Sequence, residues 1–260
     1  MSKFDNKKYI YLNNYTYSEG LNDMKDRFTE FIKLSLILKL IPILPTIYLN
    51  DRHTKKKNNL LIDYIQLPDF FFRNMPSNTN EIFYWNLTNQ FILHDELYKQ
   101  YKTQIMEYNF NLKFLDKYKN IAVEIIKQLN KPICIVHVRR GDYLNIHESL
   151  KETTAPKHIK KVLQNKIFND CYIKTNDFNL SFFDELKNDF NIKFYNDFPI
   201  LKSIYDEGDN YALYSIECCI RDLCDIKIST FNTKSSDPCW LPNNDINYFN
   251  DYLDEHNGYQ

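Results

Sequence analysis

The sequence predicts an α/β protein with a parallel sheet in its C-terminal half. Two observations lead to this fold class. Residues 133–136, directly after Pro132, are all apolar, as is typical of a parallel strand that is buried on both faces. From there to residue 230, strand-like segments alternate with helix-like segments, and this order is typical of a parallel sheet covered by helices on both faces.

The elements of this half follow one another in regular order. Strands are predicted at residues 133–138, 170–174, 192–195 and 225–230, and helices at residues 157–168, 180–190 and 210–223. The helix at 157–168 is expected because Ile159, Val162, Leu163 and Ile167 have helical spacing. Ligands of such sheets bind at the C-terminal ends of the strands, so residues that follow a strand are the first candidates for a site.

The N-terminal half has a weaker pattern. A helix is predicted from residue 22 to about residue 39, because Met24, Phe28 and Phe31 fall on one face, and Asn22 or Asp23 would be its N-cap. Residues 43–49 are typical of a strand, whereas residues 50–112 indicate no element. A further helix at 114–129 ends before Pro132, which predicts an N-terminal domain of residues 1–130 and a C-terminal domain of residues 131–260.

Composition excludes several functions. With 43% hydrophobic residues the chain can form a core, and a net charge of -1 argues against nucleic acid as a partner. The start is polar and the apolar stretches are too short to span a membrane. Six cysteines form no disulfide framework, so we expect reduced thiols and a cytoplasmic protein. Only 4 glycines leave no Gly-rich phosphate loop, so a phosphate would be held by side-chain cations and helix N-termini.

A charged motif follows the first strand of the C-terminal half. His137, Arg139 and, after a turn, Asp142 can face the same side, while Arg140 points elsewhere. Adjacent arginines at a strand end need an anion, and arginine suits bidentate contact with phosphate. Asp142 could hold one guanidinium and leave the other free for a diphosphate. An ordinary arginine–aspartate ion pair is the alternative interpretation.

The motif also carries a family resemblance. Residues 135–143 resemble the first motif of the alpha-1,2-, alpha-1,6- and protein O-fucosyltransferase superfamily. The resemblance implies a GT-B-like fold with two Rossmann-like domains. It also implies that Arg139 contacts the donor diphosphate, that Arg140 supports the site and that His137 lies by the nucleotide. Asp142 would be structural or close to the reacting groups.

A second segment of the chain matches the same family near its C-terminal end. Residues 224–233 resemble the late "C-D-x-x-(V/I)-x-T-F-S-S" segment, in which hydroxyl groups bind phosphate. Thr230 and Thr233 keep two of those hydroxyl groups, whereas Asn232 replaces a serine. The resemblance therefore adds both threonines to the donor site.

Three further matches each have an alternative. Glu217 stands where relatives use an aspartate to bind guanine, and it could equally be a solvent-exposed helix residue. Residues 175–177 resemble an "S-D-D" strand-end motif or form an ordinary helix cap. Gly20 and Asn22 resemble a glycine loop whose backbone N–H groups face the diphosphate, or they form a simple loop before a helix.

The resemblance implies a metal-independent inverting glycosyltransferase. It would move fucose from GDP-fucose to a hydroxyl of a glycan or another acceptor, with no cofactor, and the N-terminal domain would select the acceptor. Arg139 and Asp142 are the predicted catalytic residues, and Asp142, Asp23 and His147 are candidates for the base. A transferase for another nucleotide sugar and a non-catalytic nucleotide-binding protein are the rival hypotheses.

Overall fold

The structure is a computed structural model. It describes residues 6–13, 20–51, 54–71, 75–86, 95–145, 151, 154–177 and 179–230, apart from the side chains of residues 142 and 143. The chain forms two compact units, Met1–Asp116 with Glu207–Ala212 and Lys117–Asp206 with Leu213–Gln260. The sequence predicts the division after residue 130, on the C-terminal side of helix α3 (Asp116–Ile126). In the structure the division comes after Asp116, so almost all of α3 belongs to the second unit.

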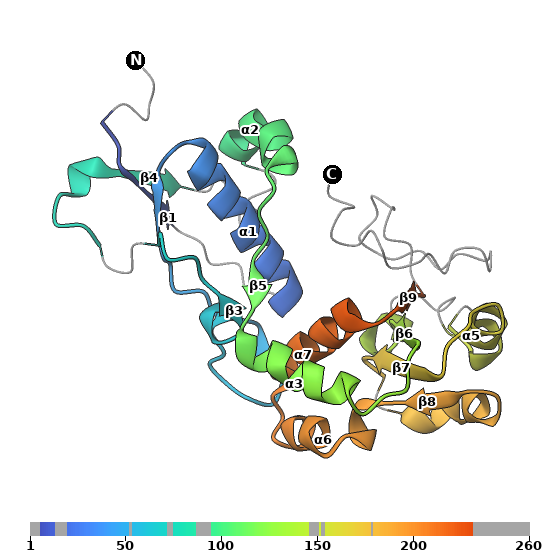
Figure 1. Cartoon of the computed structure of the whole chain (residues 1–260). Helices are drawn as coiled ribbons and strands as arrows, with labels where there is room; N and C mark the ends of the chain where they lie inside the picture. Colours follow the sequence, from blue (N-terminus) through green and yellow to red (C-terminus); the bar gives the residue numbers. More distant parts are fainter. Residues whose placement is uncertain are drawn as a thin grey trace. The chain divides into compact units, whose positions relative to one another are not determined.

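The first unit contains a three-stranded parallel sheet (Figure 1). Its central strand β1 (Tyr9–Asn13) lies between β2 (Ile41–Ile43) and β4 (Ile82–Asn86). Pro42 is tolerated because β2 is an edge strand. Of the strand predicted at residues 43–49, only Ile43 belongs to a strand, the end of β2, and Tyr48 forms an isolated bridge with Leu60. The segment pairs with its neighbour at this one point, where Leu49 N donates to Asn59 O at 2.9 Å and Ile47 O accepts from Leu61 N at 3.0 Å.

Helix α1 (Leu21–Ile37) confirms the helix predicted at residues 22–39. Met24, Phe28 and Phe31 are buried, as their spacing predicted. The predicted cap is wrong, because the N-cap is Gly20, in extended backbone conformation. Asn22 is already inside the helix, where its side-chain amide donates to Asp26 Oδ2 at 3.2 Å. A side chain inside the first turn cannot serve as the N-cap.

The remaining elements of the first unit are short. They are the 3-10 turns η2 (Leu61–Asp63) and η3 (Thr79–Glu81), the antiparallel pair β3 (Ile65–Gln66) and β5 (Lys113–Phe114), and helix α2 (Glu96–Glu107), which packs against α1. Asp95 caps α2 by accepting from Leu97 N at 2.9 Å, and it also accepts from the Trp85 indole at 2.9 Å. None of the helices in the described ranges is long and apolar enough to cross a membrane.

The second unit contains a four-stranded parallel sheet in the order β8-β7-β6-β9. β6 (Ile133–Val138), β7 (Asp170–Thr175), β8 (Asn191–Lys193) and β9 (Ile226–Ser229) confirm the four strands predicted in this half. Figure 1 shows β6, β7, β8 and β9 close together. The prediction succeeds here because each strand is an apolar run that the sheet buries.

The two faces of this sheet differ. One face packs Val136, Ile173 and Ile228 against helix α5 (Pro156–Leu163) and the 3-10 segment η6 (Leu180–Asn188). The opposite face meets helix α7 (Asn210–Leu223), the predicted helix at 210–223. The connection from β8 to α7 contains η7 (Tyr195–Asp197) and helix α6 (Pro199–Asp206), and η5 (Gly141–Asn145) follows β6.

Two helix predictions need correction. Helix α5 ends at Leu163 rather than at residue 168, because Asn165 N and Lys166 N bond three residues back and close the helix. Ile167 is consequently 87% exposed instead of buried. The segment at residues 180–190 is a 3-10 helix, and its fully buried Phe183 and Leu186 are spaced three residues apart, as that helix requires.

Candidate functional site

The C-terminal ends of three strands meet in the second unit. His137 of β6 lies in register between Lys174 of β7 and Ser229 of β9. Because the strands are parallel and in register, these three side chains are on the same face of the sheet, which is the face toward α7. This edge of the sheet is where ligands of such folds bind.

Thr230 joins the ends of β6 and β9. Its backbone N–H donates to His137 O at 3.0 Å, and its hydroxyl donates to the same oxygen at 3.2 Å. The hydroxyl oxygen in turn accepts from Arg139 N at 3.3 Å. A predicted phosphate-binding hydroxyl therefore lies directly beside the backbone of Arg139, the predicted phosphate-binding arginine.

Arg140 is buried and held from several sides. Its Nε donates to Asp177 Oδ2 at 3.0 Å, its Nη1 donates to Thr154 Oγ1 at 2.6 Å, and its guanidinium lies 3.8 Å from the centre of the Phe182 ring. Its backbone N–H donates to Asn176 Oδ1 at 2.8 Å. These contacts fix the turn that follows β6, so Arg140 acts here as a supporting residue.

The structure shows a carboxylate partner for Arg140 that the sequence analysis did not name. Asp142 was the candidate to hold a guanidinium, and Asp177 is the carboxylate that holds Arg140. The side chain of Asp142 lies outside the described residues. Residues 175–177, for which a plain helix cap was the alternative, thus contribute Asn176 and Asp177 to the turn after β6.

His137 is neutral at neutral pH. Burial, followed by the positive charges of Lys174, Arg139 and Arg221, lowers its pKa well below its usual value. A neutral imidazole at the strand end can donate one hydrogen bond and accept another. The candidate cation for an anion at this edge is Arg139, which is partly exposed.

Sequence reasoning missed Lys174. Lys174 is 3% exposed, and its ammonium lies 3.2 Å from Cys218 Sγ on α7 and 4.0 Å from the centre of the Tyr214 ring. The available signal was a lysine inside an otherwise apolar strand that leads into the polar residues 175–177, since a buried lysine needs compensating partners.

Glu217 lies further from the edge of the sheet. It is 6% exposed and accepts from the Tyr172 hydroxyl at 2.8 Å, so the alternative of a solvent-exposed helix residue is wrong. Burial raises the pKa of Glu217 to about 7, although Lys174 and the Tyr172 hydroxyl act in the opposite direction. Its contact with a guanine base stays a prediction.

The raised pKa of Glu217 predicts a pH dependence of stability. Between pH 4.5 and about 7 the folded chain keeps a proton that the unfolded chain has released, so this contribution to stability falls as pH rises and then levels off. Glu217→Gln cannot ionise. Relative to the variant, the wild type should lose on the order of 3 kcal/mol across this window in urea unfolding.

The difference between the two proteins is the quantity to follow, because His137 produces the opposite slope in both. Its lowered pKa makes the folded state less stable as pH falls below the usual value for histidine. If the two stability curves run parallel from pH 4.5 to pH 8, the raised pKa of Glu217 is refuted.

The other predicted site residues have separate places. Gly20 and Asn22 belong to the first unit, at the start of α1. Thr233, Asn232 and His147 lie outside the described residues. In the described part of the chain, no three His, Cys, Asp or Glu side chains are grouped in a way that could hold a metal ion.

Comparisons with known proteins find similarity at the level of structure. No protein-family profile and no curated protein sequence matches the chain. A crystal structure of POFUT1 in complex with GDP is similar, with a TM-score of 0.53, 11% sequence identity, and coverage of 86% of this chain and 90% of that chain. The chain has a GT-B-like fold. A structure of POFUT1 with GDP-fucose aligns with a TM-score of 0.43 at 11% identity over 84% of this chain and 94% of that one.

The GT-B-like fold confirms the predicted α/β architecture with two Rossmann-like domains and a parallel sheet in the C-terminal half. At 11% identity the likeness extends to the fold alone. The assignment of donor-binding and catalytic residues consequently rests on the motif and on the contacts described above.

Proposed function

We propose that the chain is an inverting glycosyltransferase that takes fucose from GDP-fucose. One observation carries the proposal. His137, Arg139 and Thr230 come together at the C-terminal edge of a parallel sheet, in a fold similar to that of POFUT1, a protein O-fucosyltransferase that binds GDP. This is the place in the fold where a nucleotide is expected.

In the proposed reaction an acceptor hydroxyl attacks the anomeric carbon of fucose from the face opposite GDP. The bond between that carbon and the diphosphate oxygen breaks, and its electron pair stays on the departing phosphate. Arg139 stabilises the negative charge as it develops, with the hydroxyl of Thr230 beside it. The proton of the acceptor goes to Asp142, Asp23 or His147, the candidates that the sequence offers.

The fixed turn after β6 supports this role. Because Asn176, Asp177 and Thr154 hold Arg140, the neighbouring Arg139 begins from a rigid backbone. A cation that is positioned in advance stabilises the leaving group without reorganisation in the transition state. No cofactor takes part in the proposed reaction, and the N-terminal unit selects the acceptor.

Calorimetric titration with GDP, GDP-fucose and UDP tests the donor site. We expect micromolar GDP binding that weakens about 10- to 100-fold in Arg139→Ala, because a charge-assisted hydrogen bond to phosphate is lost. Lys131→Ala removes an exposed cation at the opposite end of β6 and should leave the affinity unchanged.

The remaining outcomes separate the rival functions. Undetectable GDP binding, or binding that Arg139→Ala does not weaken, overturns the donor site. Tighter binding of UDP indicates another nucleotide sugar. Binding of GDP-fucose with neither hydrolysis nor transfer indicates a non-catalytic nucleotide-binding protein.

A further inference from the structure

A small groove lies in the first unit beside the β3–β5 ladder. The ladder pairs Ile65 with Phe114 and Gln66 with Lys113. If it continued, the next partners would be residues 67 and 112, followed by Pro68 and Asn111. Proline has no N–H to donate, so the pairing is interrupted there. The two segments, residues 66–69 and 110–113, enclose about 230 Å³ of free space.

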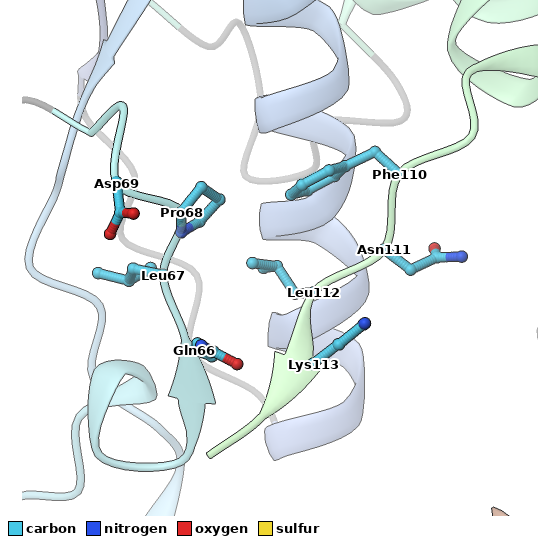
Figure 2. A pocket seen from close by; sticks show the side chains of 8 residues that line it. All are labelled: Gln66, Leu67, Pro68, Asp69, Phe110, Asn111, Leu112 and Lys113. Atoms are coloured by element: carbon cyan, nitrogen blue, oxygen red, sulfur yellow. The ribbon is translucent and has the colours of Figure 1, made fainter. Parts of the chain in front are cut away.

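Half of the residues that line the groove are apolar, and the other half are two amides, Gln66 and Asn111, and one side chain of each charge. Figure 2 shows Phe110 and Leu112 pointing into the gap from one segment, with Pro68 and Gln66 on the facing segment. Leu112 is buried, Phe110 and Pro68 are partly buried, and Gln66 is exposed. Apolar walls with a few polar groups are the usual composition of a small-ligand site.

The size and the charge of the groove restrict its occupant. Pockets for drug-sized ligands hold about 300–1,000 Å³, so this one suits a single ring. Asp69 and Lys113 carry opposite charges, which leaves the lining without net charge and favours a neutral ligand. Two exposed aromatic residues are close to the lining in sequence: Phe70 directly follows Asp69, and Tyr108 is two residues before Phe110.

We propose that this groove binds one pyranose ring of a neutral glycan acceptor. One C–H face of the sugar lies against the ring of Phe110, because the negative face of an aromatic ring attracts polarised C–H groups, and Pro68 adds apolar contact. The Gln66 amide both donates to and accepts from the ring hydroxyls. The inference rests on the proposed function, since it names the acceptor of that reaction.

A sugar fits this lining better than a peptide strand. A strand added between the two segments would draw its affinity from backbone hydrogen bonds to both neighbours. Pro68 removes one donor from that pattern, whereas the amide of Gln66 and the apolar rings do not depend on a ladder.

Saturation-transfer NMR on the full chain tests the groove, with lactose, N-acetyllactosamine and chitotetraose as probes and an extended uncharged peptide as competitor. We expect at least one sugar to receive saturation, and we expect the peptide not to displace it. Its affinity should fall about 10-fold in Phe110→Ala and about 5-fold in Gln66→Ala. Tyr84→Ala and Gln100→Ala, which replace exposed residues elsewhere in the unit, should leave the affinity unchanged.

GDP affinity, measured in the same samples, separates this inference from the proposed function. Sugar binding that both groove variants weaken while GDP affinity is constant supports the groove. GDP binding without saturation of any sugar, or sugar binding that neither variant weakens, overturns it. Should Phe110→Ala fail to fold, Gln66→Ala at the exposed position still decides. Sugar binding without GDP binding would support the groove and overturn the proposed donor site.

Discussion

Asp177→Ala is expected to lower the free energy of unfolding by about 3–5 kcal/mol, because it leaves the charge of Arg140 buried without its carboxylate. The side chain of Arg140 is 7% exposed, and the Nε–Oδ2 distance is 3.0 Å. Asp177 also accepts from Asn179 N at 3.0 Å, so the start of the following segment loses a hydrogen bond as well. Urea unfolding followed by circular dichroism measures the change.

Two further proteins make this test specific. Asp206→Ala removes the Lys202–Asp206 pair, whose side chains are both 54% exposed, and should cost about 0.5 kcal/mol or less. Arg140→Met together with Asp177→Ala removes the buried charge and should recover part of the stability. Equal losses in Asp177→Ala and Asp206→Ala would contradict the structural role of the ion pair.

The strands of the second unit could be predicted because their signal is local. β6 is an apolar run bounded by Pro132 and the charged motif, so neither its position nor its type needed a partner strand to be recognised. The first unit was harder to predict, and two of its strands show the reason. β3 and β5 are two residues each and depend on each other for backbone hydrogen bonds, which no window of sequence reveals.

The residues of the candidate site also differ in whether the sequence alone could identify them. His137, Arg139 and Thr230 were found because their spacing forms motifs in the sequence. Thr154, which holds Arg140, lies in a segment without pattern and reaches the guanidinium only in the folded chain.

The burial of Glu217 was hidden for a related reason. Helical periodicity separates buried from exposed positions only when one face of a helix is exposed to solvent. Nearly all faces of α7 are buried, so its periodicity does not show that Glu217 is buried. The environment of Glu217 therefore became known only from the packing of α7 against β7.

Gly141→Ala is expected to destabilise the chain by about 2–5 kcal/mol and to weaken GDP binding. Gly141 has φ +42°, where an alanine costs about 1–2 kcal/mol, and overpacking adds about 1–3 kcal/mol. Its new Cβ would lie 2.7 Å from the backbone oxygen of Asn176 and still closer to the Asn176 amide. A backbone atom cannot avoid the new Cβ by changing rotamer as a flexible side chain can, so the backbone of the turn has to shift.

The effect on GDP follows from what the turn holds. Asn176 accepts from Arg140 N at 2.8 Å, so displacing Asn176 shifts the backbone next to Arg139. Gly208→Ala is the matched control, since Gly208 also has positive φ, at +79°, and would place its Cβ 2.5 Å from Cβ of Lys55 in the first unit. Both variants should lose stability in urea unfolding, but at a temperature where both are folded only Gly141→Ala should bind GDP more weakly. Equal GDP affinity in the two variants would mean that the turn after β6 does not position the donor site.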